Sequence, residues 1–83
     1  MQITNEETKT DAEAIAEAGY LLYGDRYQAS LARDLGVNRR MVGFWASGSK
    51  PVTSRRWQQI ADLLEQRAYE CWNLAPAIRR AGQ

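Results

Sequence analysis

Residues 28–51 read QASLARDLGVNRRMVGFWASGSKP, and this stretch predicts two short helices joined by a tight turn. The first helix is expected over residues 28–35 and ends at Gly36, because glycine readily adopts the positive φ that such a turn requires. The second is expected over residues 39–47, with Asn38 as its N-cap. Two helices joined by so short a turn must cross steeply, so their contact has little space.

The side chains of this stretch have the sizes that a steep crossing needs. The small residue Ala32 stands where the two helices would touch, and Gly48 can end the second helix. The other inward positions hold larger apolar residues that would close a core: Leu31, Leu35, Val37, Val42 and Trp45. The pattern predicts a helix-turn-helix.

One further helix is predicted on each side of this stretch. Residues 10–13 read TDAE and match a capping box, so a helix is expected from there to Gly24. The last helix is expected over residues 54–75, with Thr53 as its N-cap. Pro76 would end it, because proline lacks the backbone N–H that continues a helix.

The 83 residues are predicted to form a single all-α domain. It would occupy residues 10–75, between a flexible tail at residues 1–9 and a C-terminal tail at residues 76–83. A hydrophobic content of 45% and a charged content of 25% are typical of globular proteins. With one cysteine, Cys71, and no histidine, we expect no disulfide, no metal site, no cofactor and no small-molecule ligand. An acidic N-terminus and the lack of a long apolar run predict a cytoplasmic protein outside the membrane.

Basic residues are concentrated in the middle of the sequence. The chain carries a net charge of +1, but residues 26–56 hold seven basic residues against one acidic residue, a net charge of +6. These seven are Arg26, Arg33, Arg39, Arg40, Lys50, Arg55 and Arg56. Such a distribution predicts one surface that binds a polyanion. The alternative is an ordinary solvated charged surface.

The residues from Gln28 to Pro51 resemble the helix-turn-helix of the Cro/C1-type (XRE-like) repressors of phages and bacteria, and the resemblance extends over about residues 12–66. It implies a compact four- to five-helix bundle, a lambda-repressor-like DNA-binding domain. Two positions depart from the family. Ala46 stands where an acidic residue is frequent, and Gly43 costs the second helix about 1 kcal/mol against alanine.

The resemblance also implies which residues would contact DNA. Reading of bases in the major groove carries over to Asn38, Arg39, Arg40, Gly43 and Phe44. Contact with phosphates carries over to Gln28, Ser49, Lys50, Thr53 and Arg55. Arginine suits bidentate contact with guanine, and phenylalanine suits the thymine methyl group. The alternatives are phosphate contact alone for the two arginines, packing for Phe44, and helix capping for Gln28 and Thr53.

The apolar stripe of the last helix runs on beyond the turns that a small core needs. Its distal members are Ala68, Cys71, Trp72 and Ala75. They would either pack against the first helix or form the interface of a homodimer.

Together with the resemblance, these features imply a sequence-specific regulator of transcription that binds double-stranded DNA. We expect a repressor of phage or mobile-element genes, bound as a homodimer to an inverted repeat with half-sites one helical turn apart. The alternative is a helical protein–protein interaction module with an incidental basic face. An enzyme is not expected, because the sequence offers no general base beyond scattered carboxylates.

Overall fold

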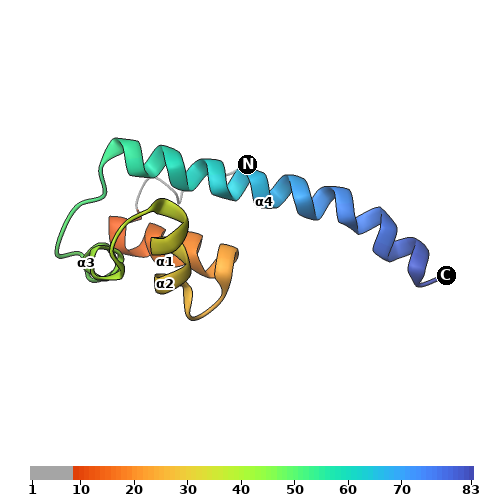
Figure 1. The fold of residues 1–83 in the computed structure, drawn as a ribbon, viewed down its shortest axis with the longest axis horizontal. Coiled ribbons are helices and arrows are strands. Elements are labelled where there is room, and N and C mark those ends of the chain that lie inside the picture. The colour runs from red at the N-terminus through yellow and green to blue at the C-terminus, as the bar shows by residue number, and fades with distance from the viewer. Residues whose placement is uncertain (1–8) are drawn as a thin grey trace.

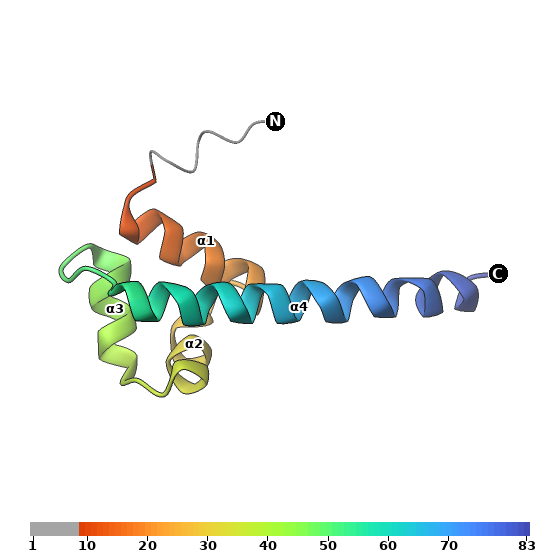
Figure 2. The same cartoon turned by 90° about the horizontal axis from the view of Figure 1, so that it is seen from above.

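The computed structural model describes residues 9–83, which form four α-helices and no strand (Figure 1). The helices are α1 (Asp11–Tyr23), α2 (Tyr27–Leu35), α3 (Arg39–Ser47) and α4 (Ser54–Ala81). The first three helices and the start of α4 form a globular body, and the rest of α4 projects from it as a single rod (Figures 1 and 2). The prediction of an all-α chain is confirmed, and the prediction of a compact bundle is wrong for the second half of α4.

The helix ends follow the local sequence signals. Thr10 and Glu13 form the predicted capping box, in which each side chain accepts a hydrogen bond from the backbone N–H of the other. Asn38 caps α3 and Thr53 caps α4, each by accepting a backbone N–H of the first turn. Gly36 ends α2 with a φ of 71°, a conformation that glycine adopts without the steric penalty of a side chain.

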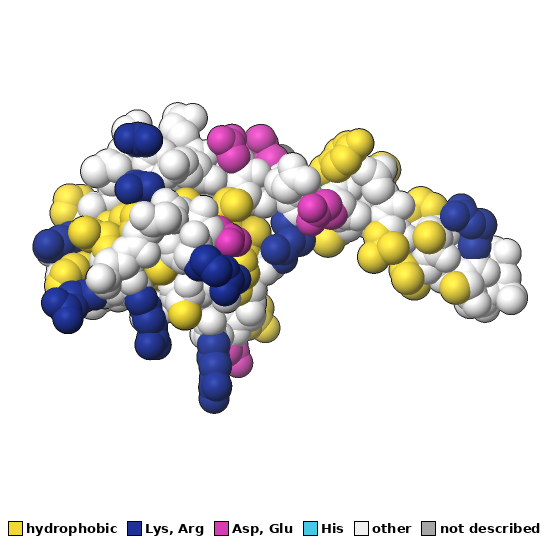
Figure 3. Space-filling view, viewed as in Figure 1, with side chains coloured by type: hydrophobic (Ala, Val, Ile, Leu, Met, Phe, Trp, Pro, Cys, Tyr) yellow, Lys and Arg dark blue, Asp and Glu magenta, His cyan; other side chains and the backbone are white. Residues whose placement is uncertain are grey.

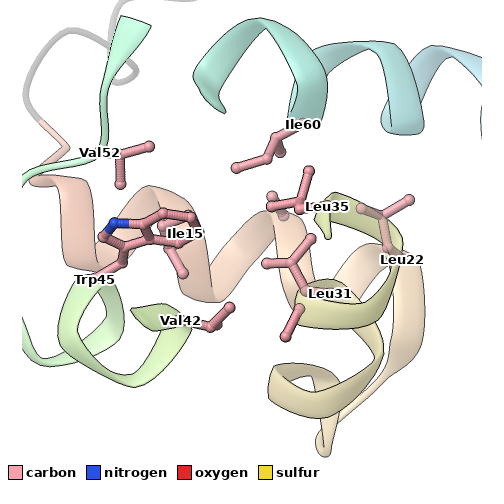
Figure 4. Packing of buried hydrophobic residues seen from close by; sticks show 10 residues of the cluster. Ile15, Leu22, Leu31, Leu35, Val42, Trp45, Val52 and Ile60 are labelled. Carbon is pink, nitrogen blue, oxygen red and sulfur yellow. The ribbon is translucent and has the colours of Figure 1, made fainter. Parts of the chain in front are cut away.

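The core lies where the three short helices meet the first turns of α4 (Figure 4). Its buried members are Ile15, Ala18, Leu22, Leu31, Ala32, Leu35, Val42, Trp45, Val52 and Ile60. Val37 and Trp57 are partly buried against it. Burying one such aliphatic side chain contributes about 1.5–3 kcal/mol to stability. Because α2 and α3 both contribute buried side chains to this core, the core stabilises the contact between the two helices.

Helix α4 continues to Ala81 instead of ending before Pro76, so the prediction of a C-terminal tail at residues 76–83 is wrong. Proline cannot donate to the carbonyl of Trp72 one turn earlier, but all residues from 68 onward are exposed and water can satisfy that carbonyl. Despite its length, α4 is not apolar enough to cross a membrane, and neither is any other helix in residues 9–83.

The predicted N-terminal tail at residues 1–9 lies outside the described residues except for Lys9. The ammonium group of Lys9 forms an ion pair of 3.0 Å with Glu17 of α1.

A polar cluster joins α1, α2 and α4 beside the core. The Tyr23 hydroxyl donates a hydrogen bond of 2.5 Å to Asp34. The guanidinium of Arg67 lies 5.8 Å from the centroid of the Tyr23 ring and donates to the carbonyl of Leu22. Burial, followed by the hydrogen bond to Asp34, raises the pKa of Tyr23 to about 12.

This raised pKa predicts that the protein loses stability between pH 10 and about 12, because the unfolded chain then loses a proton that the folded protein retains. Denaturant unfolding followed by circular dichroism across this interval measures the loss. Tyr23→Phe should make the decline shallower. Tyr20→Phe, at a position that is 60% exposed, should leave it unchanged. An equally steep decline in the Tyr23→Phe protein would contradict the prediction.

Candidate nucleic-acid interface

The residues predicted to read bases gather around one open hollow on the surface. It is lined by Gln28, Asn38, Arg39, Arg40, Gly43 and Phe44. All five predicted base-reading residues are therefore present, together with one residue predicted to contact phosphate. The crossing of α2 and α3 brings Gln28, at the start of α2, beside the first turns of α3.

The two arginines of the hollow have no acidic partner in the part of the chain that the structure describes. Arg39 and Arg40 occupy the first turn of α3, and both are exposed. No carboxylate of residues 9–83 lies within 4.0 Å of either guanidinium. Because a guanidinium has five N–H donors and no acceptor, both side chains are available to an external acceptor such as a base edge or a phosphate.

Gly43 keeps the side of α3 open at the hollow. A β-carbon built on Gly43 would lie 3.8 Å from the amide oxygen of Gln28 and touch nothing closer. In contrast, a β-carbon on Gly19 of α1 would lie 2.2 Å from the ring of Tyr27, so packing requires glycine there. Packing does not require glycine in α3. The missing side chain instead allows an external surface to approach the helix backbone closely.

The start of α2 offers backbone donors beside the same hollow. Arg26 occupies the N-cap position and forms no capping hydrogen bond, so the first N–H groups of α2 have no side-chain acceptor in the described part of the chain. Gln28 is the second residue of the helix, and the capping role considered for it is wrong. Unsatisfied N–H groups at a helix N-terminus favour bound anions such as phosphate.

The loop after α3 places a cation against the aromatic ring of the hollow. The ammonium group of Lys50 lies 4.7 Å from the centroid of the Phe44 ring, a cation–π contact. The Ser49 hydroxyl lies 2.8 Å from that of Ser47. Phe44 is half-buried, so it has both a packed side and a side that faces the hollow.

Thr53 and Arg55 lie at the start of α4 and do not line the hollow. The capping alternative for Thr53 is confirmed, because its hydroxyl accepts the N–H of Arg56 at 3.3 Å. Arg55 is exposed. Four of the five predicted phosphate contacts, Ser49, Lys50, Thr53 and Arg55, therefore lie outside the lining of the hollow, although Lys50 contacts Phe44 and shares a neighbouring pocket with Thr53.

Sequence reasoning missed Arg26 as a candidate site residue. Arg26 is exposed and lines a second hollow with Asp25, Gln28, Ala29 and Arg39. Its position directly before a predicted helix start was the available signal. Arg56, in contrast, contributed to the basic count but donates within the fold, to the Leu35 carbonyl at 3.0 Å and to Gln59 at 2.8 Å.

Lys and Arg side chains surround the end of the body that carries α3 (Figure 3). This is the surface on which the hollow opens, and an anionic ligand would meet a positive potential there. Comparison of the chain with protein-family models, with curated proteins and with solved structures gave no match. The function is therefore inferred from the chemistry of these side chains and from their placement.

Proposed function

We propose that this chain is a sequence-specific, double-stranded DNA-binding protein in which α2 and α3 act as a helix-turn-helix. The hollow carries the proposal. It combines two arginines that have no acidic partner among residues 9–83, two side-chain amides and an aromatic ring, contributed by residues 28 and 38–44. These groups supply the donors, acceptors and apolar contact with which proteins read base edges in the major groove.

Phosphate contacts would flank this reading surface. The free N–H groups at the start of α2, with Gln28 and Arg26, lie on one side of the hollow. Lys50 lies on another side, against Phe44. Ser49, Thr53 and Arg55 are exposed in the loop and at the start of α4, outside the hollow, and would contact phosphates farther along the duplex. Such contacts fix the orientation of a protein on the duplex while the base contacts provide specificity.

We infer further that the protein is a cytoplasmic repressor of phage or mobile-element genes that acts as a homodimer on an inverted repeat. The support is the resemblance of residues 28–51 to Cro/C1-type repressors, together with exposed apolar residues on α4. These are Ala68, Cys71, Trp72 and Ala75, the residues predicted for a dimer interface. Trp72 is 80% exposed, and a second copy would cover such a surface.

Binding to duplex DNA is expected to weaken steeply as the salt concentration rises, because bound phosphates release their counterions. If each protomer neutralises about three phosphates, the slope of log K against log salt is about −5 for a dimer. Fluorescence anisotropy of a labelled duplex, titrated between about 50 and 200 mM salt, measures this slope. A flat response would overturn DNA binding and favour the protein–protein interaction module.

A further inference from the structure

The part of α4 beyond Arg67, which we call the arm (residues 68–81), leaves the body with one continuous apolar face. The members of this face are Ala68, Cys71, Leu74, Ala75 and Ile78, and the exposed Trp72 lies at its edge. At three or four residues apart, they continue the line of Trp57, Ile60 and Leu64, which face the core. Leu74 is 57% exposed and Ile78 is 61% exposed. The apolar face that is buried at the start of α4 is therefore exposed to solvent along the arm.

The charges of the arm differ between its two ends. Glu65 and Glu70 lie at its base, next to the body, and Arg79 and Arg80 lie at its tip. The basic residue at the base, Arg67, donates to the Leu22 carbonyl and lies 3.7 Å from Glu70, so Arg67 offsets part of the acidic charge at the base and leaves it with a net charge of about −1. A second arm in parallel would place the two basic tips together. An antiparallel arm would place each basic tip beside an acidic base, and this arrangement is favourable.

We propose that the arms of two copies of this chain pair in antiparallel orientation, about a two-fold axis between Trp72 and Asn73. In this register Cys71 packs against Leu74 of the partner subunit, and Glu65 lies near Arg79 of the partner subunit, on the same flank of the apolar face. The globular body limits the length over which the two arms can lie side by side. In this register the tip of each arm, at Ala81, reaches the body of the other copy. The pairing specifies the homodimer named above, and its consequence for DNA rests on the proposed function.

This pairing would place both DNA-binding surfaces on the same side of the dimer. Figure 1 shows α3 end-on, and Figure 2 shows that its N-terminal end faces the viewer of Figure 1. The body lies on the same side of α4 as the apolar face of the arm, since both follow one line of residues. The partner's arm therefore lies in the plane of Figure 1, and a two-fold axis perpendicular to that plane directs both α3 N-termini towards the viewer.

The arm also sets the distance between the two copies of α3. Helix α3 lies level with the start of α4 at Ser54, about 18 residues from the axis (Figure 1). At about 1.5 Å per residue, the two copies lie about 55 Å apart. This distance is closer to two turns of B-DNA, about 68 Å, than to one turn of about 34 Å. We therefore expect half-sites two turns apart rather than the single turn inferred from the sequence.

Cross-linking without DNA tests the pairing. Two single-cysteine proteins are made, one with Cys71→Ser and Ala68→Cys, the other with Cys71→Ser and Ile78→Cys. In the antiparallel register, position 68 of one copy lies beside position 78 of the other. The two copies of position 68 lie about 13 Å apart along the direction of the helices. Because a disulfide requires Cα atoms within about 7 Å, the mixture should cross-link at least about ten times faster than either protein alone.

Each outcome decides between stated alternatives. Faster cross-linking of each separate protein would show parallel arms and overturn the proposal, as would a wild-type monomer in sedimentation equilibrium at about 100 µM, well above typical dimer dissociation constants. Selection of bound sequences from random duplexes should return half-sites about 20 base pairs apart. Half-sites about 10 base pairs apart would overturn the arm geometry and support DNA binding. Antiparallel cross-linking without any DNA binding would support the pairing and overturn the proposed function.

Discussion

Replacing Arg39 or Arg40 by alanine is expected to lower the affinity for the specific DNA site by about 1–3 kcal/mol at each half-site. Both guanidiniums are exposed at the hollow and have no acidic partner in residues 9–83, so the bond that each forms with a base has no internal competitor. A dimer loses the contact twice, and its affinity should fall about 30-fold or more. Preference at one base position of each half-site should be relaxed as well.

The expected result has two matched controls. Arg33→Ala removes an exposed arginine of α2 that lies 3.6 Å from Asp34 and lines neither hollow, so its effect on affinity should be small. Lys50→Ala should weaken all sequences alike, as expected of a phosphate contact. Binding of a set of single-base operator variants measures both effects. A uniform loss for Arg39→Ala and Arg40→Ala, with the base preference intact, would show that both arginines contact phosphate alone.

The short helices were predictable because their ends depend on local groups. Thr10, Asn38 and Thr53 each cap a helix through a hydrogen bond to a residue two or three positions later. Gly36 supplies the positive φ between α2 and α3. None of these interactions needs a partner from a distant part of the chain, so a single sequence contains the information.

The end of α4 was not predictable in the same way. A proline inside a helix costs about 3 kcal/mol, and this cost favoured an end at residue 75. The residues after Pro76 are strong helix formers, including two alanines and two arginines, and the exposed carbonyl of Trp72 is accessible to water. Because the helix was predicted to end at residue 75, Leu74 and Ile78 were not recognised as members of the apolar face. Their spacing from Cys71, by three and seven residues, was the signal that could have revealed them.

The candidate site was predictable where it is contiguous. Five of the six residues around the hollow fall within residues 38–44 on one short helix and its cap. Which of the other basic residues contribute to the site depends on the directions of their side chains, and a count of charges does not give these directions. Arg56 binds the Leu35 carbonyl, Lys50 covers Phe44, and Arg26 joins the rim of a neighbouring hollow. A cluster of basic residues thus predicts an anion-binding surface better than it predicts which cations form it.

Trp45→Ala is expected to lower the free energy of unfolding by about 3–5 kcal/mol, since Trp45 is 3% exposed at the centre of the core. The total stability of a small domain is about 5–15 kcal/mol, so this variant should lose a large fraction of its stability. Urea unfolding followed by circular dichroism measures the loss. The experiment requires a protein concentration below the dimer dissociation constant, because dimerisation would add to the apparent stability.

Trp72→Ala provides the matched tryptophan substitution on the arm. With its side chain 80% exposed, the free energy of unfolding of the monomer should change by less than about 0.5 kcal/mol. The dimer fraction and the affinity for the full inverted repeat should fall, while binding to a single half-site stays unchanged. If Trp72→Ala unfolds the monomer as Trp45→Ala does, Trp72 belongs to the internal core. If it changes neither stability nor dimer fraction, the arms do not pair through this residue, and the contacts of Cys71, Leu74 and Ile78 must hold the dimer alone.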